Sequence, residues 1–354
     1  MRLSIIIPNH NYAGFVGSAI RSALDVRWPD KEVIVVDDGS TDGSREVIAA
    51  FGDQVTAIFQ ENGGQNSAVN AGFSRSSGDV VLVLDSDDLL RPGVAEGIAA
   101  VWHDGVAKVQ FGLSYINQRG ETLGEEWPDY RRRHREPLSA LRRRAYYEAP
   151  TTSGNAWSRR FLEQVFPLPV CRPNRVPGAY YGLFFDAYLN MLAPCFGAIV
   201  TLPDPQGYYR VHLENDSGSG KAISPEFALN RSDDYARTVA KANEVLAALG
   251  KSPGFPIDCE RDEMQMRYRL VARKLLPERR AGPGLLRTFA KYCRSVWLSD
   301  ADLKHKALFA GWAVVTLAAP PRIARRAFDL RSSPGLRPAC LKGLMRVRQG
   351  GSRP

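Results

Sequence analysis

Val80-Val81-Leu82-Val83-Leu84-Asp85-Ser86-Asp87-Asp88 is a run of five apolar residues that leads directly into three carboxylates within four positions. A continuous apolar run of this length is typical of a parallel strand that is buried on both faces. The binding crevice of such a sheet lies at the carboxyl ends of its strands, where these carboxylates would stand. Crowded carboxylates repel one another unless a cation holds them, and Mg²⁺ or Mn²⁺ shares its ligand positions between carboxylates and substrate phosphates. The stretch therefore indicates a divalent cation that carries a diphosphate.

Taken alone, this segment is equally compatible with an ordinary acidic turn, and its context decides between the two. A second apolar run, Glu32–Val36, also ends in two aspartates, Asp37 and Asp38. Strand and helix patterns alternate from residue 3 onwards, which is typical of βαβ units and a parallel sheet. We therefore interpret the two acidic strand ends as parts of one site. The expected strands are 3–8, 32–36, 54–59 and 80–84, and the expected helices include 16–24 and 66–74.

These residues resemble the glycosyltransferases of family 2, which have the GT-A nucleotide-sugar fold. The matching segments fall in the family's order and spacing, and a weaker resemblance continues to about Gly220. The resemblance implies an α/β protein with a GT-A, Rossmann-like sheet that is mixed but mostly parallel and flanked by helices. It also implies an inverting transfer from a nucleotide-diphosphate sugar. The matching segments are Ser4–Pro8 with Asn11, Val36–Asp42, Glu61–Gly64, Asn70–Gly72, Gly78–Asp79 and Leu84–Asp88.

The patterns along the chain predict three regions. Residues 1–223 form the catalytic domain, with a nucleotide-sugar-binding half in residues 1–110 and an acceptor half in residues 111–223. Residues 224–319 form a mainly helical C-terminal region, because apolar residues recur at helical spacing over 227–249 and 264–276, with a loop-like break at 251–256. Residues 320–354 form a basic tail.

The resemblance implies a donor pocket at the ends of the strands. Asp38 would accept a hydrogen bond from uracil or another base, with Asp37 beside it. The alternative for these two aspartates is a turn in which their side chains bond nearby backbone. The other residues predicted to bind the donor are Pro8, Asn9, His10, Asn11, Asn66, Asn70, Asp85 and Ser86.

The carboxylate cluster resembles the DXD motif of the family. By that resemblance Asp85 would face the sugar or ribose, and Asp87 would bind the metal, Mn²⁺ or Mg²⁺. A divalent cation can neutralise the charge that develops on a departing nucleoside diphosphate. His212 stands in a tyrosine-arginine-x-histidine frame like that of the family and would be a second metal ligand; its imidazole suits Mn²⁺ better than Mg²⁺. Asp88 would face away and cap the following helix, with Pro92 at an early helical position.

The chain departs from the family pattern at two places. A basic residue often precedes the asparagine that matches Asn70, but here Val69 does, so Gln65, Asn66 or a later arginine would supply that contact. Inverting relatives carry an acidic pair whose second carboxylate deprotonates the acceptor hydroxyl. Here Phe185 takes the first place and Asp186 the second. Because one carboxylate within reach of the attacking oxygen suffices, we predict Asp186 as the base. The alternative is an aspartate that is favoured by the dipole at a helix start.

Composition and charge narrow the class of protein. The chain has 354 residues with 44% apolar content, enough for a large core. Its five cysteines are scattered without a CxxC pair, which predicts neither zinc nor disulfides and favours a reducing cytoplasm. No apolar run reaches the about eighteen residues that a membrane span needs. Nucleic-acid binding is not expected, because no binding motif with stacking aromatics accompanies the formal net charge of +9.

Positive charge gathers at the C-terminal end, where residues 320–354 hold nine arginines and lysines against one acid, Asp329. The apolar segment 307–319 precedes them. This part of the chain would either lie in the interface of an anionic membrane, on the inner face of the cell membrane, or form a core helix followed by a solvated tail. The basic runs 131–135 and 142–144 would contact an acceptor phosphate or the membrane, or form a solvated face.

Three functions remain open from the sequence. The first is a metal-dependent glycosyltransferase that moves a sugar, from a UDP-sugar by preference, to a hydroxyl of a saccharide or a polyprenyl-linked saccharide. The second is a nucleotidyltransferase of the same fold, which usually needs a glycine- and basic-rich loop that residues 9–12 do not provide. The third is a non-catalytic protein that binds a membrane or a polyanion, against which Asp85, Asp87, Asp186 and His212 argue.

Overall fold

The computed structural model describes residues 1–131, 136–170, 184–212, 223–276 and 284–332. Its strands are β1 (Leu3–Asn9), β2 (Lys31–Asp38), β3 (Thr56–Gln60), β4 (Val80–Val83), β5 (Leu89–Leu90), β6 (Val106–Ile116), β7 (Thr122–Trp127), β8 (Asn155–Ser158) and β9 (Ala198–Arg210). They form one sheet in the order β3-β2-β1-β4-β8-β6-β9-β5, with β7 paired to β6. The strands β1 to β4 and the pair β6/β9 are parallel, and β8 runs antiparallel to β4 and β6. The predicted α/β class with a mixed, mostly parallel sheet is confirmed.

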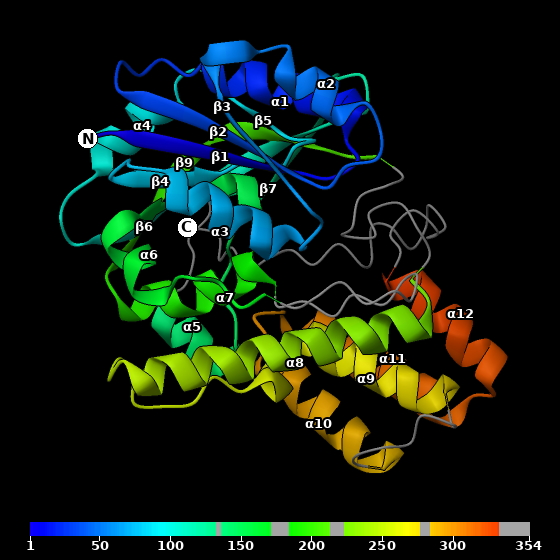
Figure 1. Ribbon diagram of the computed structural model, residues 1–354. Coiled ribbons are helices and arrows are strands. Elements are labelled where there is room, and N and C mark those ends of the chain that lie inside the picture. The colour runs from blue at the N-terminus through cyan, green and yellow to red at the C-terminus, as the bar shows by residue number, and fades with distance from the viewer. Residues whose placement is uncertain (132–135, 171–183, 213–222, 277–283, 333–354) are drawn as a thin grey trace.

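Helices cover both faces of this sheet (Figure 1). One face packs against α1 (Ala13–Leu24), α2 (Ser44–Ala49) and α4 (Val94–Val101). The other face packs against α3 (Gln65–Arg75), α5 (Pro137–Arg144), α6 (Arg159–Val165) and α7 (Phe185–Leu192). The strand ends that carry Asp38 and Asp85 are therefore held between two helical layers.

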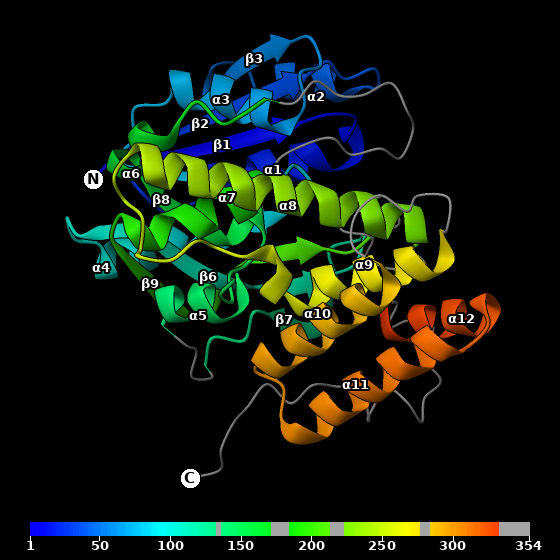
Figure 2. The ribbon, with the colours of Figure 1, turned by 90° about the horizontal axis from the view of Figure 1, so that it is seen from below.

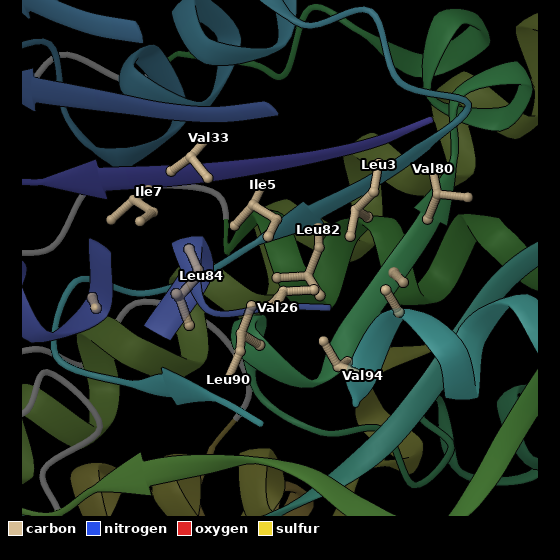
Figure 3. Close-up of a cluster of buried hydrophobic side chains, with 14 of the residues drawn as sticks. Leu3, Ile5, Ile7, Val26, Val33, Val80, Leu82, Leu84, Leu90 and Val94 are labelled. Carbon is tan, nitrogen blue, oxygen red and sulfur yellow. The ribbon is translucent and has the colours of Figure 1, made fainter. Parts of the chain in front are cut away.

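The central strands are buried on both faces, as their continuous apolar sequences predict. In β1 the alternate residues Leu3, Ile5 and Ile7 belong to the core under α1, whereas Ile6 belongs to the core on the opposite face. In the same way Leu82 of β4 faces the first core, which Figure 3 shows. Because side chains alternate with a period of two along a strand, a strand with two buried faces must be apolar at every position.

One glycine allows α3 to lie close to the sheet. A Cβ atom at Gly72 would stand 2.4 Å from Cγ2 of Ile6 and 3.3 Å from Cγ2 of Val36. Any larger residue would push α3 away from β1 and β2. The position of α3 matters because its first residue, Gln65, reaches the carboxylate cluster after β4.

The C-terminal region is helical, as predicted. It consists of α8 (Pro225–Ala248), α9 (Glu263–Leu275), α10 (Leu285–Leu298), α11 (Leu303–Ala318) and α12 (Pro321–Ser332), which lie together on one side of the catalytic domain (Figures 1 and 2). The predicted break at 251–256 lies between α8 and α9. Within the described part of the chain, no helix has the length and apolar character to cross a membrane.

The beginning of the predicted basic tail belongs to this bundle instead. Residues 321–332 form α12, whose Ala324 and Phe328 are fully buried, and the Phe328 ring packs edge-on against Tyr268 of α9. The sequence left open a membrane-bound or a solvated segment for the tail, and neither alternative used this apolar spacing of four residues. Residues 333–354 lie outside the described residues.

The arginine run on α5 holds the bundle to the catalytic domain. Arg143 Nε donates to the carbonyl oxygen of Leu298 at 2.8 Å, and Arg144 pairs with Asp300. Arg261 donates to the carbonyl oxygen of Arg142. The run 142–144 therefore makes contacts within the protein. In the other run, Arg131 pairs with Glu126 and Asp129, and residues 132–135 lie outside the described residues.

Candidate active site

The loops after β1 and β2 are tied together by side chains. Asn9 Nδ2 donates to Asp37 Oδ2 at 3.1 Å and to Ser40 Oγ at 3.2 Å. Asn11, with a φ of 58°, accepts from the backbone N–H of Thr41 at 2.7 Å. Asn9 Oδ1 is buried and has no hydrogen-bond partner among the described residues. The two loops therefore form one rigid wall with an unused acceptor.

Asp37 stabilises this wall through hydrogen bonds of its side chain. Its side chain is fully buried and accepts from the Ser40 N–H at 3.1 Å and from Arg45 Nε at 2.9 Å. Burial raises the pKa of Asp37, but the hydrogen bonds from Ser40 and Arg45 outweigh it and leave the pKa lowered. The contact with Ser40 is the turn that the sequence left as an alternative for this residue.

Asp38 holds the start of α3. Its Oδ1 accepts from Gln60 Nε2 at 2.6 Å and from the Gly63 N–H at 2.9 Å, and its Oδ2 accepts from the Gly64 N–H at 2.8 Å. A carboxylate has about four lone-pair sites, so one remains for a base. His10 Nδ1 donates to the carbonyl oxygen of Asp38 at 2.9 Å, which fixes the ring beside the strand end.

The two predicted asparagines of α3 contact protein backbone. Asn70 donates to the carbonyl oxygen of Leu168 at 2.9 Å and accepts from the Leu168 N–H at 2.7 Å. Asn66 donates to the carbonyl oxygen of Pro169 at 2.8 Å. These bonds hold residues 168–169 against α3, so both side chains anchor a loop in the structure. Pro8 lies within β1 opposite Val36.

The carboxylate cluster after β4 divides into separate environments. Asp85 is partly exposed and accepts from Gln65 Nε2 at 3.1 Å, and its N–H donates to Ser153 Oγ at 3.1 Å. Asp87 Oδ2 accepts from His212 Nε2 at 2.9 Å, which brings the two predicted metal ligands together. Ser86, between them, is buried.

Asp88 does not cap the following helix, contrary to the prediction. It is fully buried, and its two carboxylate oxygens accept from Ser153 Oγ at 2.7 Å and from the Arg210 N–H at 2.9 Å. Burial, together with the charges of Asp87 and Asp85, raises its pKa well above the usual range. The N-cap of α4 is Gly93, and Pro92 precedes it, because β5 intervenes between the cluster and the helix.

Aromatic and cationic side chains surround His212. Its ring stacks on Phe15 with centroids 4.9 Å apart and meets Tyr12 edge-on at 5.7 Å. Arg210 donates through Nε to the carbonyl oxygen of Asp87 at 2.8 Å, and its guanidinium lies 5.2 Å from the centre of the Phe15 ring. The imidazole is thus fixed by α1 and by the end of β9.

The predicted base lies in the first turn of α7. Asp186 is partly buried, and its Oδ1 accepts from the Ala187 N–H at 2.7 Å. Burial raises its pKa, and the charges of Arg231 and Lys108 partly oppose that shift. Lys108 of β6 is fully buried, and its Nζ donates to Asn190 Oδ1, one turn after Asp186, at 2.5 Å.

A divalent cation fits the chemistry of this donor set. Asp87 offers a carboxylate and His212 an imidazole within hydrogen-bond distance of each other, with the Asp85 carboxylate two residues away. Among the described residues, no group of three histidine, cysteine, aspartate or glutamate side chains is arranged to hold a metal by itself. A cation here would take its remaining ligands from substrate phosphates and water, as Mg²⁺ and Mn²⁺ commonly do.

Sequence reasoning missed several residues of this site. Arg210 was part of the recognised histidine frame, but no role was assigned to it. Lys108 carries a usable signal, because it is the single charged residue in a strand that is mostly apolar. Phe15 and Asn190 carry no local signal, since their partners lie far away in the chain.

Known proteins resemble this chain in sequence and structure. Residues 4–166 match the family described as Glycosyl transferase family 2. An uncharacterized glycosyltransferase of Nostoc sp. is 30% identical over 279 residues, which are 77% of this chain and 84% of that protein. An uncharacterized glycosyltransferase of Rickettsia typhi is 35% identical over 132 residues, 36% of this chain and 42% of that protein. The crystal structure of S. aureus TarS 1-349 in complex with UDP-GlcNAc superposes with a TM-score of 0.52 at 16% identity, over 94% of this chain and 92% of that chain; this likeness concerns the fold.

Proposed function

Since the chain belongs to glycosyltransferase family 2, and is thus a glycosyltransferase with a GT-A fold, we propose that it moves a sugar from a nucleotide-diphosphate donor with inversion. The observation that carries the proposal is the pair of Asp87 Oδ2 and His212 Nε2, 2.9 Å apart, at the end of the central strand β4. Family membership leaves no support for the nucleotidyltransferase or the non-catalytic alternative.

The donor is a nucleotide-diphosphate sugar, with UDP-sugars preferred. Asn9 Oδ1 and the remaining lone pair of Asp38 supply two acceptors at neighbouring strand ends, and the N3–H and ribose hydroxyls of a uridine are donors. The structural neighbour TarS was crystallised with UDP-GlcNAc, which is consistent with this preference.

Asp87 and His212 would hold a divalent cation, Mn²⁺ or Mg²⁺, which supplies Lewis acidity to the departing diphosphate when bound. Asp85 would contact the sugar or ribose, and Gln65 orients its carboxylate through the 3.1 Å hydrogen bond. Asp88 and Arg210 act indirectly, because their bonds fix the backbone on either side of Asp87 and His212.

Asp186 is the proposed general base. In its ionised form it takes the proton of the acceptor hydroxyl as that oxygen forms a bond to the anomeric carbon, and the bond to the nucleoside diphosphate breaks. Partial burial raises the pKa of this carboxylate and makes it a stronger base than an exposed aspartate. The acceptor is a saccharide or a polyprenyl-linked saccharide.

The proposal is tested by a panel of nucleotide sugars in thermal unfolding, with and without Mn²⁺, followed by assays for the released nucleoside diphosphate. A ligand that binds only the folded state raises its stability. We expect a metal-dependent stabilisation by one donor that Asp87→Ala abolishes and that Asp53→Ala, at an exposed carboxylate of the same domain, leaves unchanged. A donor that stabilises Asp87→Ala as much as the original protein would contradict the assigned site.

A further inference from the structure

The outer face of α11 is apolar. Leu303 is 77%, Leu308 37%, Val314 52% and Val315 47% exposed. The exposed residues recur at spacings of three and four, which places them along one side of the helix over its full length. We call this side of the helix the α11 outer stripe; its apolar residues are Leu303, Ala307, Leu308, Gly311, Val314, Val315 and Ala318. Lys304 is the one charged residue among the exposed residues of α11.

The α11 outer stripe is not needed for the bundle core. The opposite side of the helix supplies the buried residues Trp312, Ala313 and Thr316, and Trp312 Nε1 donates to the carbonyl oxygen of Ala327 at 2.9 Å. A helix that packs through one face normally carries polar residues on the other. In Figure 2 α11 lies at the edge of the molecule, away from the strands β1 to β3. Among the residues that the structure describes, none covers this outer face, so it is exposed to a partner outside the fold.

The charges around the stripe indicate what that partner is. From Leu303 to Phe328 the chain has no acidic residue, and the exposed cations Lys304, Arg322 and Arg326 lie at the two ends of α11 and on α12. Two more exposed apolar side chains belong to the neighbouring helices: Ile323 of α12 is 55% exposed, and Trp297 of α10, whose ring lies 5.3 Å from Lys306 Nζ, is 66% exposed. Three neighbouring carboxylates are already engaged: Asp300 with Arg144, Asp302 with His305, and Asp329 with Arg325.

We propose that the α11 outer stripe lies in the interface of an anionic membrane, with Lys304, Arg322 and Arg326 at the headgroups. An apolar helical face with flanking cations binds such an interface through the burial of apolar area and through electrostatic attraction to anionic lipids. Each cation near the surface contributes about a fivefold factor in affinity. Tryptophan at the position of Trp297 suits the boundary between headgroups and acyl chains. A second copy of the chain is disfavoured as the occupant, because it would place cations against cations. This inference concerns membrane attachment and does not depend on the proposed sugar transfer.

Gly311 provides a paired test, because a Cβ added there meets no heavy atom within 4 Å. Full-length variants are sedimented with vesicles of phosphatidylcholine alone and with added phosphatidylglycerol. We expect binding to the anionic vesicles only, tightened about fivefold by Gly311→Leu and weakened about tenfold by Gly311→Glu. Leu123→Glu, at an apolar residue of β7 that is 48% exposed, is the matched control and should bind as the original protein does.

Three results would overturn the proposal. Equal binding to both kinds of vesicle would show that attraction between the cations and anionic headgroups does not contribute to binding. Equal binding by the two Gly311 variants would show that another segment of the chain makes the contact. A dimer in light scattering that Gly311→Glu dissociates would assign the stripe to a second copy of the chain. Thermal unfolding of each variant confirms that it is folded.

Discussion

Asp87 and Asp88 are adjacent in the chain but have different roles. Asp87 meets His212 and is partly exposed, whereas Asp88 is fully buried and joins β9 to the turn before β8. A buried carboxylate with two strong donors holds backbone in place, and only its neighbour is available to a ligand. The geometry of the exposed pair therefore depends on the buried residue.

Asp88→Ala is expected to destabilise the protein by about 3 kcal/mol, because it leaves the hydroxyl of Ser153 and the N–H of Arg210 buried without an acceptor. Urea unfolding measures this change. Asp53→Ala, at an exposed site, should change the free energy of unfolding by less than about 0.5 kcal/mol. A similarly small effect of Asp88→Ala would mean that Asp88 does not brace the site.

Lys108 is expected to tune the base. Burial raises the pKa of Asp186, and it also lowers the pKa of Lys108 well below its usual range. In its protonated form Lys108 opposes the shift at Asp186, so Lys108→Met should raise the pKa of Asp186 further. The acidic limb of the kcat/KM profile would then move to higher pH, since activity needs the ionised carboxylate. The pH profile is the measurement, with Asn190→Ala as a variant that removes one hydrogen bond of Lys108 Nζ, keeps the one to the Tyr147 hydroxyl and retains the lysine. A limb that moves equally in both variants would indicate a packing effect rather than a charge effect.

Two aspartates that cap helices of the bundle show how burial reverses the direction in which the pKa of an aspartate shifts. Asp262 is the N-cap of α9, accepts from the N–H groups of Met264 and Gln265, and is 3% exposed. Asp302 caps α11 in the same manner at the surface. Burial raises the pKa of Asp262 to about 7, whereas the hydrogen bonds from the His305 backbone and side chain lower that of Asp302.

Asp262→Asn and Asp302→Asn are therefore expected to change the pH dependence of stability in opposite directions. A raised pKa in the folded state means that the stability of the original protein, relative to Asp262→Asn, falls as pH rises from the unfolded value of about 4 to about 7. A lowered pKa means that the advantage over Asp302→Asn is present above pH 4 and is lost in acid. Asparagine keeps the cap in both variants. Free energies of unfolding measured across this pH range test both expectations. If the stability difference from the original protein changed with pH in the same way for the two variants, the assigned pKa shifts would be contradicted.

Elements with a clear period could be predicted from the sequence, and contacts between distant segments could not. The apolar run 80–84 predicts a buried strand because its neighbours along the chain are enough to decide it. The direction of Asp88 depends on Ser153 and Arg210, which are 65 and 122 residues away. Likewise α12 is a helix with buried Phe328 because other helices cover it, while its arginines alone favour solvent. The positions where the strands end could be predicted from the sequence, and the partners of the residues there could not.

At the scale of the whole molecule, α8 joins two cores. Its Tyr235, Val239 and Leu246 belong to the core of the acceptor half, whereas Ala228, near its start, belongs to the core of the bundle. Tyr235 also donates to the carbonyl oxygen of Ala145, directly after α5. A helix shared by two cores couples their stabilities, because neither core can unfold without exposing part of the other.

Phe328→Ala tests this coupling from the far end of the bundle. The side chain is fully buried, so its removal is expected to cost about 4 kcal/mol. Unfolding in urea is followed by two probes: the helix content in the far ultraviolet, and the stabilisation by donor at the distant active site. If α8 couples the cores, both probes report one transition, and the variant shifts that transition to lower urea by the same amount for each. Leu123→Ala, at an exposed residue of β7, should shift neither probe. Two separate transitions, with the donor-responsive one unmoved, would show that the bundle unfolds by itself and that α8 belongs energetically to the catalytic domain alone.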